Sequence, residues 1–149
     1  MACPFFLPAE RLSDGPGLHA PRLPLGAAYS GSCTCRPEIS FQPDEATLRD
    51  VCNWGYVRGR CGHFPAGSAA DAVRFSVVQE SDAMLEILYV LELAHVPARH
   101  GTLRFSILDG VLDVDCGGLL AAQARSFIDS YLAPSQRPLE TKLQKSVTA

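Results

Sequence analysis

Three kinds of feature are missing from this sequence of 149 residues. No apolar run approaches the ~20 residues that a membrane-spanning helix needs. The first eight residues contain two prolines and no basic residue, which is not the pattern of a secretory leader. There is no phosphate-binding glycine loop, no serine elbow and no dinucleotide fingerprint. These absences predict a chain that works in the reducing cytoplasm, away from membranes and without the common nucleotide or hydrolase sites.

Positive charge is also scarce. The 13 Lys and Arg residues face 16 Asp and Glu residues, which gives a net charge of −3 and a pI near 5.7. Such a balance gives no broad attraction to phosphate backbones or anionic membranes. The nearest approach to a basic patch is Arg58 with Arg60. We therefore expect no nucleic-acid or membrane partner. An unidentified protein partner stays open, and so does the choice between a monomer and a homodimer.

The rest of the composition suits one folded domain. Hydrophobic residues make up 47% of the chain and charged residues 19%, as in ordinary globular proteins. Residues 1–31 hold five prolines and four glycines, which predicts an irregular N-terminal strap. Residues 32–133 are expected to form a single α+β domain, and residues 134–149 a polar, flexible tail.

Periodicity predicts the elements of that domain. Pro43, Asp44 and Glu45 suit the start of a helix, which should end at residues 53–55 with Cys52 pointing inward. Residues 55–68 are glycine-rich and predict a loop. Alternating apolar residues then indicate strands at 73–77, 85–93 and 103–107, with a fourth, shorter strand at 110–114; the connection before the third strand is expected at 95–101. An apolar stripe predicts a second helix at 119–132. The expected fold is a small antiparallel sheet of three or four strands packed by two helices.

Four of the six cysteines fall within 29 residues, with the spacing C-x-C-x16-C-x8-C: Cys33, Cys35, Cys52 and Cys61. In an extended backbone, side chains two residues apart point to the same side, so the first two sulfurs suit one centre. A disulfide across a single intervening residue would close a strained ring. Cysteines in a reducing compartment usually indicate metal or redox chemistry. The four cysteines therefore predict a thiolate metal site. The simpler interpretation is four unrelated buried cysteines.

The surroundings of these cysteines suit a metal as well. Four nearby arginines would offset the net charge of −2 on a four-thiolate centre and lower the thiol pKa values: Arg36, Arg49, Arg58 and Arg60. The spacing matches neither zinc knuckles nor ferredoxins. Dispersed thiolates shielded by Trp54, Tyr56 and Phe64 favour an iron–sulfur cluster of the [4Fe–4S] type, with zinc a near-equal alternative.

The function predicted from this site is a non-enzymatic metalloprotein whose centre is structural or transfers single electrons to a partner. One alternative is a zinc-stabilised protein-interaction module. Another is a small thiol-dependent enzyme that uses Cys61, with His63 as its base. A contribution of His63 or Cys116 to the metal site stays open. Cys3, close to the N-terminus, is expected to have no role.

Overall fold

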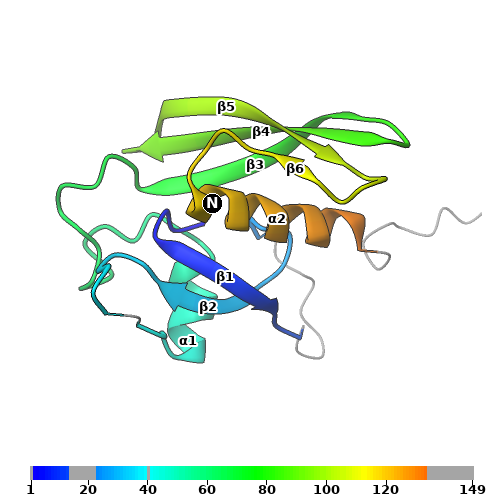
Figure 1. The fold of residues 1–149 in the computed structure, drawn as a ribbon. Coiled ribbons are helices and arrows are strands. Elements are labelled where there is room, and N and C mark those ends of the chain that lie inside the picture. Colours follow the sequence, from blue (N-terminus) through cyan, green and yellow to red (C-terminus); the bar gives the residue numbers. More distant parts are fainter. Residues whose placement is uncertain (1, 14–22, 40, 134–149) are drawn as a thin grey trace, which may run out of the picture.

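The computed structural model describes residues 2–13, 23–39 and 41–133. The tail expected at 134–149 lies outside the described residues, as do Pro16 and Pro21 of the strap. The elements, in chain order, are β1 (Phe6–Arg11), β2 (Tyr29–Cys33), α1 (Glu45–Thr47), the π-helical turn η1 (Leu48–Cys52), β3 (Ala72–Glu80), β4 (Met84–Leu93), β5 (Val96–Ser106), β6 (Leu112–Asp113) and α2 (Gly118–Leu132). Figure 1 shows their arrangement.

The predicted antiparallel sheet is confirmed, with four strands in the order β3-β4-β5-β6. Its apolar alternation places Val73, Ile87 and Leu103 fully or almost fully inside the core. The connection expected at 95–101 is wrong, because Val96 already pairs with Leu93 and β5 begins there. The turn consists of Ala94 and His95, which both have positive φ, of 50° and 64°. Two consecutive residues of positive φ match the right-handed twist of a hairpin, so the strands join directly.

The N-terminal segment is not irregular throughout, which corrects the sequence expectation. Its described part contains β1 and β2, which pair as a separate two-stranded antiparallel ribbon. Pro8 lies opposite Gly31 and is buried, and the ribbon tolerates it because β1 is an edge strand, with β2 as its one neighbour among the described strands. A Cβ on Gly31 would lie 2.1 Å from the carbonyl oxygen of Leu7, so only glycine allows this approach.

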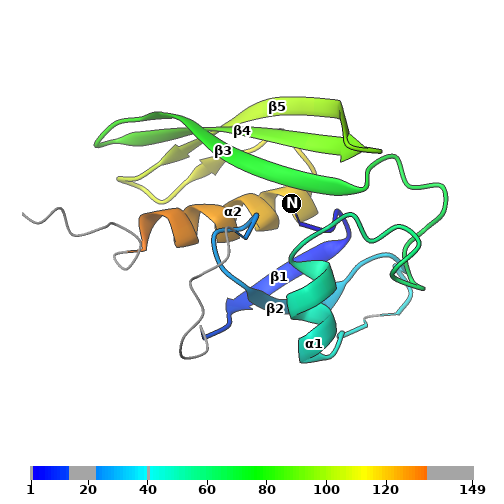
Figure 2. The same cartoon turned by 180° about the vertical axis from the view of Figure 1, so that it is seen from behind.

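Helix α2 lies between the four-stranded sheet and the ribbon (Figures 1 and 2). On one side the ring of Phe127 stacks on Phe75 of β3, with 5.6 Å between centroids. On the other side Tyr29 of β2 donates a hydrogen bond of 2.7 Å to the carbonyl of Ser126. The predicted second helix is thus confirmed, and it covers the sheet as expected.

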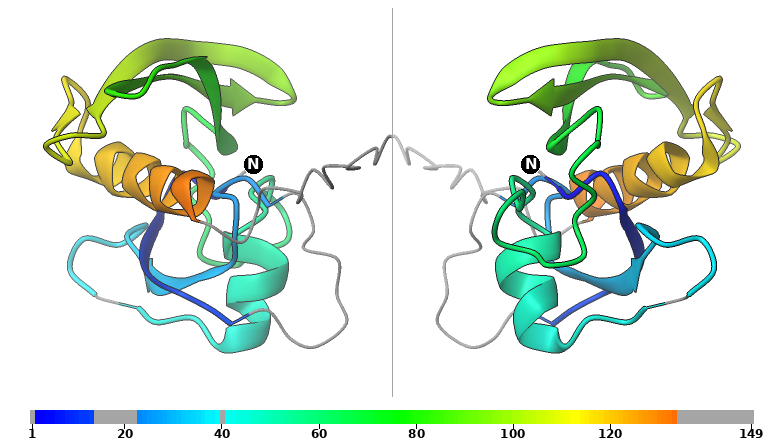
Figure 3. Two further views of the ribbon diagram at one scale, coloured as in Figure 1. Left: turned by 90° about the vertical axis from the view of Figure 1, so that its right-hand side faces the viewer. Right: turned by 90° about the vertical axis from the view of Figure 1, so that its left-hand side faces the viewer.

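The first helix has a different place from the one expected. The segment of α1 and η1 lies beside the ribbon, next to β2, and not on the four-stranded sheet, as the end views in Figure 3 also show. Of the helices in the described part of the chain, only α2 packs on that sheet. No helix in the described part of the chain is both long and apolar enough to cross a membrane.

Candidate metal centre

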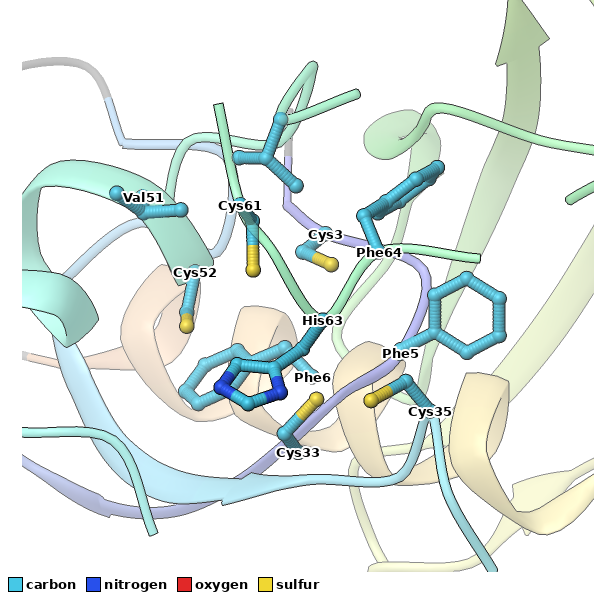
Figure 4. Close-up of a pocket in the computed structure, with 11 residues that line it drawn as sticks. Cys3, Phe5, Phe6, Cys33, Cys35, Val51, Cys52, Cys61, His63 and Phe64 are labelled. Atoms are coloured by element: carbon cyan, nitrogen blue, oxygen red, sulfur yellow. The ribbon is translucent and has the colours of Figure 1, made fainter. Parts of the chain in front are cut away.

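All four predicted cysteines line one cavity, which lies among the ribbon, η1 and the loop after it (Figure 4). The cavity has a volume of about 20 Å³. A fifth cysteine, Cys3, lines it as well. The complete lining consists of Cys3, Phe5, Phe6, Cys33, Cys35, Val51, Cys52, Val57, Cys61, His63 and Phe64. The four cysteines predicted as ligands, Cys33, Cys35, Cys52 and Cys61, therefore border one shared space.

The β1–β2 ribbon positions the first pair of cysteines. Cys33 pairs with Phe6, so both side chains lie on the same face of the ribbon. The backbone N–H of Cys33 donates to the carbonyl of Phe41 at 2.8 Å. Beyond the strand, both the N–H and the hydroxyl of Thr34 donate to the carbonyl of Phe5, at 2.8 and 3.0 Å. Cys35, in the bend that follows the strand, also lines the cavity.

The helical segment positions Cys52. Its start lies where it was predicted, and Asp44 caps it, since the Asp44 carboxylate accepts a bond from the N–H of Thr47 at 2.9 Å. At its end the chain widens into a π-turn, in which the N–H of Asn53 reaches the carbonyl of Leu48 at 3.1 Å. The side chain of Asn53 is fully buried and bonds both the N–H and the carbonyl of Tyr29, each at 3.0 Å. Asn53 thereby fixes Cys52 against β2.

A turn in the glycine-rich loop positions Cys61. Its N–H donates to the carbonyl of the buried Val57 at 2.9 Å, and its own carbonyl accepts from Phe64 at 3.1 Å. Arg58 holds this loop to the sheet, because its guanidinium bonds the buried carboxylate of Asp71 at 2.7 Å. The loop predicted at residues 55–68 is therefore held by two sets of contacts: the backbone bonds of Cys61 within the turn and the Arg58–Asp71 pair.

Cys3 was missed by the sequence interpretation. It is buried, with 7% of its surface exposed, and its N–H donates to the carbonyl of Cys52 at 2.9 Å. Its carbonyl accepts from the side chain of Gln123 in α2 at 2.8 Å. The apolar run at residues 5–7 that follows Cys3 indicated that this segment is buried. It did not indicate which residues Cys3 would contact.

The aromatic shield differs from the one expected. Phe64 lines the cavity, and its ring makes an edge contact with Phe5 at 5.5 Å between centroids. Trp54 and Tyr56 do not line the cavity: Trp54 is exposed, and Tyr56 stacks on His95 at 4.1 Å. The shield comes instead from the N-terminal segment, through Phe5 and the buried Phe6.

Burial controls the ionisation of the thiols. It raises the pKa of Cys3 and of Cys52 to about 12, and that of Cys33 to about 11. Negative charge on neighbouring thiolates raises these pKa values further: Cys52, Cys33 and Cys61 act on Cys3. These three thiols are therefore neutral at pH 7, and a cation that binds them would have to replace their protons.

Two of the four arginines do not act as the sequence predicted. Arg49 pairs with Glu45 at 2.9 Å, and Arg58 pairs with Asp71, so both charges have carboxylate partners. The expectation that arginines lower the thiol pKa values is wrong for Cys33 and Cys52, because burial dominates there.

A larger cleft adjoins the cavity. It has a volume of about 310 Å³ and shares five lining residues with the cavity: Cys33, Val51, Cys52, Cys61 and His63. Arg60 and Asp44 line its outer part. Three of the sulfurs therefore lie where the closed apolar cavity meets an accessible cleft.

The two further residues considered as metal ligands, His63 and Cys116, differ in position. His63 lines both spaces, and its ring packs against Phe41 at 4.5 Å between centroids. Cys116 is absent from the cavity lining. Among the described residues, no group of three or more His, Cys, Asp or Glu side chains is arranged to hold a metal ion. The sulfurs surround a shared space, as Figure 4 shows, and do not already meet at one point.

Comparison of the chain with protein-family models, curated proteins and solved structures finds no match.

Proposed function

We propose that this protein is a non-enzymatic metalloprotein whose cysteine thiolates hold an iron–sulfur cluster of the [4Fe–4S] type at the cavity. The observation that carries the proposal is the convergence of Cys33, Cys35, Cys52 and Cys61 from separate elements on one apolar cavity. Four unrelated core cysteines have no reason to share a cavity. A thiolate cluster gives such a reason, since it needs four sulfurs and a shield from water.

The spread of the sulfurs favours a cluster over a single ion. Zinc takes four ligands about 2.3 Å from one point, so its sulfurs must lie close together. No such group is present among the described side chains. A cubane presents a separate iron to each thiolate and therefore suits sulfurs that surround a space. Three of the four cysteines, Cys33, Cys52 and Cys61, also line the adjoining cleft of about 310 Å³, which gives the cluster room next to the cavity.

The position of the cavity is compatible with either a structural or an electron-transfer role. Cys33, Cys35 and Cys61 are only partly buried, so a centre there would lie close to the protein surface. A protein partner docked over the cleft would approach it closely. The apolar lining from Phe5, Phe6 and Phe64 would keep water from the inner side.

Zinc remains the second candidate, in a protein-interaction module. The observation in its favour is the small size of the closed cavity, because about 20 Å³ is room for about one water molecule. A single ion would fit that space once the sulfurs moved inward. Cys61 is flanked by Gly59 and Gly62, and a Cβ on either glycine would meet no atom within 4 Å, so this loop has room to move.

Anaerobic purification with metal and sulfide analysis tests the proposal. We expect a brown protein with a broad visible absorption, containing iron and acid-labile sulfide in near-equal amounts. A colourless protein with stoichiometric zinc would replace the first candidate with the second. A metal-free protein that loses a catalytic activity on alkylation of Cys61 would contradict both and indicate the thiol enzyme.

A further inference from the structure

Five sulfurs line the cavity, but a four-thiolate centre uses four. Both a tetrahedral zinc and a cubane cluster take four cysteine ligands. Cys33, Cys52 and Cys61 are the cysteines that line both the cavity and the cleft, as His63 also does, so we place these three sulfurs in every four-cysteine ligand set. The fourth ligand is then either Cys3 or Cys35.

The backbone around Cys3 is built to hold its side chain in place. Ala2 and Val73 exchange hydrogen bonds of 2.8 and 2.9 Å, which fix the start of the described chain to β3. Cys3 follows Ala2, and its N–H donates to the carbonyl of Cys52 while its carbonyl accepts from the side chain of Gln123. Gln123, itself buried, also bonds the carbonyl of Phe6 at 2.7 Å. Three different elements therefore determine where the sulfur of Cys3 lies.

The surroundings of the two sulfurs differ. In Figure 4 the side chain of Cys3 lies between those of Cys61 and Phe64, on the inner side of the space that the sulfurs surround. Cys35 lies at the edge of this space, beside Cys33 and close to Phe5, and on the opposite side from Cys52. Both cysteines line the cavity and neither lines the cleft, but Cys3 is buried whereas Cys35 is only partly buried.

We propose that Cys3 is the fourth ligand of the metal centre, together with Cys33, Cys52 and Cys61, and that Cys35 is a neighbouring free thiol. This assignment rests on the proposed function and changes its ligand set. The metal then joins the chain start, the end of β2, the end of η1 and the following loop. A centre held in this way links the N-terminal segment, through metal–thiolate bonds, to η1 and the loop after it.

Two single variants test the assignment, with Cys116→Ser as the control outside the cavity. Each full-length protein is purified anaerobically, and iron, zinc and sulfide are measured per chain. We expect Cys3→Ser to lose most of its metal, at least about tenfold, while Cys35→Ser and Cys116→Ser keep the wild-type content. Alkylation of the native, metal-loaded wild type followed by mass spectrometry should label Cys35 and leave Cys33, Cys52 and Cys61 protected.

The outcomes separate the assignment from the proposed function. A wild type without metal contradicts the proposed function, and the assignment falls with it. A metal-loaded wild type whose Cys35→Ser variant is metal-free contradicts the assignment alone, and so does full metal content in Cys3→Ser. If Cys3→Ser does not fold, the metal content of Cys35→Ser and the alkylation of Cys35 in the wild type decide. A Cys35 that is protected from alkylation and whose replacement removes the metal overturns the proposal.

Discussion

At the scale of single residues, the site is defined by thiols that burial keeps neutral. A buried thiolate without a counter-charge is unfavourable, which is why the pKa values of Cys3, Cys33 and Cys52 are raised. A bound metal removes this penalty, since its charge compensates the thiolates and protons are released when it binds. The same residues therefore behave differently in the metal-free and the metal-loaded protein.

The metal-free, reduced protein should lose stability at alkaline pH. In the unfolded chain a thiol titrates near its ordinary value of 9.0, whereas Cys3 and Cys52 titrate at about 12 when folded. Between these values the folded state binds more protons, so the contribution to stability is full below pH 9 and falls as pH rises toward 12. Thermal unfolding at about pH 8 and about pH 10.5 measures this fall.

Cys52→Ser separates the thiols from the other alkaline groups. Tyr29 and Tyr56 also have raised pKa values, mainly through burial, and act in the same direction. The variant lacks one raised thiol, so its stability should fall less steeply with pH than that of the wild type. Equal slopes, or a wild type whose stability does not fall, would contradict the thiol pKa values.

At the scale of elements, the ribbon and the helical segment hold the sulfurs in position. Gly31→Ala should disrupt the β1–β2 pairing, because the new Cβ would lie 2.1 Å from the carbonyl oxygen of Leu7. Overpacking of this kind costs about 1–3 kcal/mol or more. Urea unfolding of the metal-free protein measures the loss. Gly62→Ala is the matched control, since a Cβ there meets no atom within 4 Å, and its midpoint should stay close to that of the wild type.

Asn53→Ala tests the link between the two elements. The substitution leaves the buried N–H and carbonyl of Tyr29 without their partner, which costs about 1–3 kcal/mol for each group. We expect lower stability and also a lower metal content, because Cys52 is no longer fixed against β2. The exposed Gln79→Ala in β3 serves as the control. A variant that unfolds earlier yet binds metal as tightly as the wild type would show that this link does not position the ligand.

The elements that sequence predicted are those whose contacts follow from local pattern. Alternation around Val73, Ile87 and Phe105 predicted three strands, and Pro43 followed by two acidic residues predicted the helix start. The strands β1 and β2 were missed because Pro8 and Gly31 are local strand breakers. Their pairing depends on a partner about twenty residues away, and proline is tolerated only because β1 is an edge strand.

At the scale of the whole molecule, the cysteine site and the four-stranded sheet are distinct parts of one core. Four of the five cavity cysteines could be selected from the sequence, because they lie within 29 residues and share a plausible chemistry. Cys3 could not, since its position depends on bonds to β3, η1 and α2 that no local pattern reveals. The shielding role of Phe5 and Phe6 was missed for the same reason.

Metal removal should therefore loosen one part of the molecule more than the other. Structural zinc supplies ~10–16 kcal/mol in small peptides, and a whole domain has a stability of only ~5–15 kcal/mol. Hydrogen exchange followed by mass spectrometry, with and without a chelator, should show faster exchange at residues 33–61. The hairpin of β4 and β5 should change little, because its bonds lie within the sheet. Uniform or unchanged exchange would contradict a metal-held segment.

The central claim is that thiolates around this cavity hold a metal, and the metal content of Cys52→Ser tests it most directly. Cys52 is buried between the cavity and the cleft, and it belongs to every ligand set considered above. With the native protein and Cys116→Ser prepared anaerobically alongside, we predict that Cys52→Ser retains at most about a tenth of the native iron and sulfide, while Cys116→Ser retains all of it. Native metal content in a folded Cys52→Ser protein would contradict the claim.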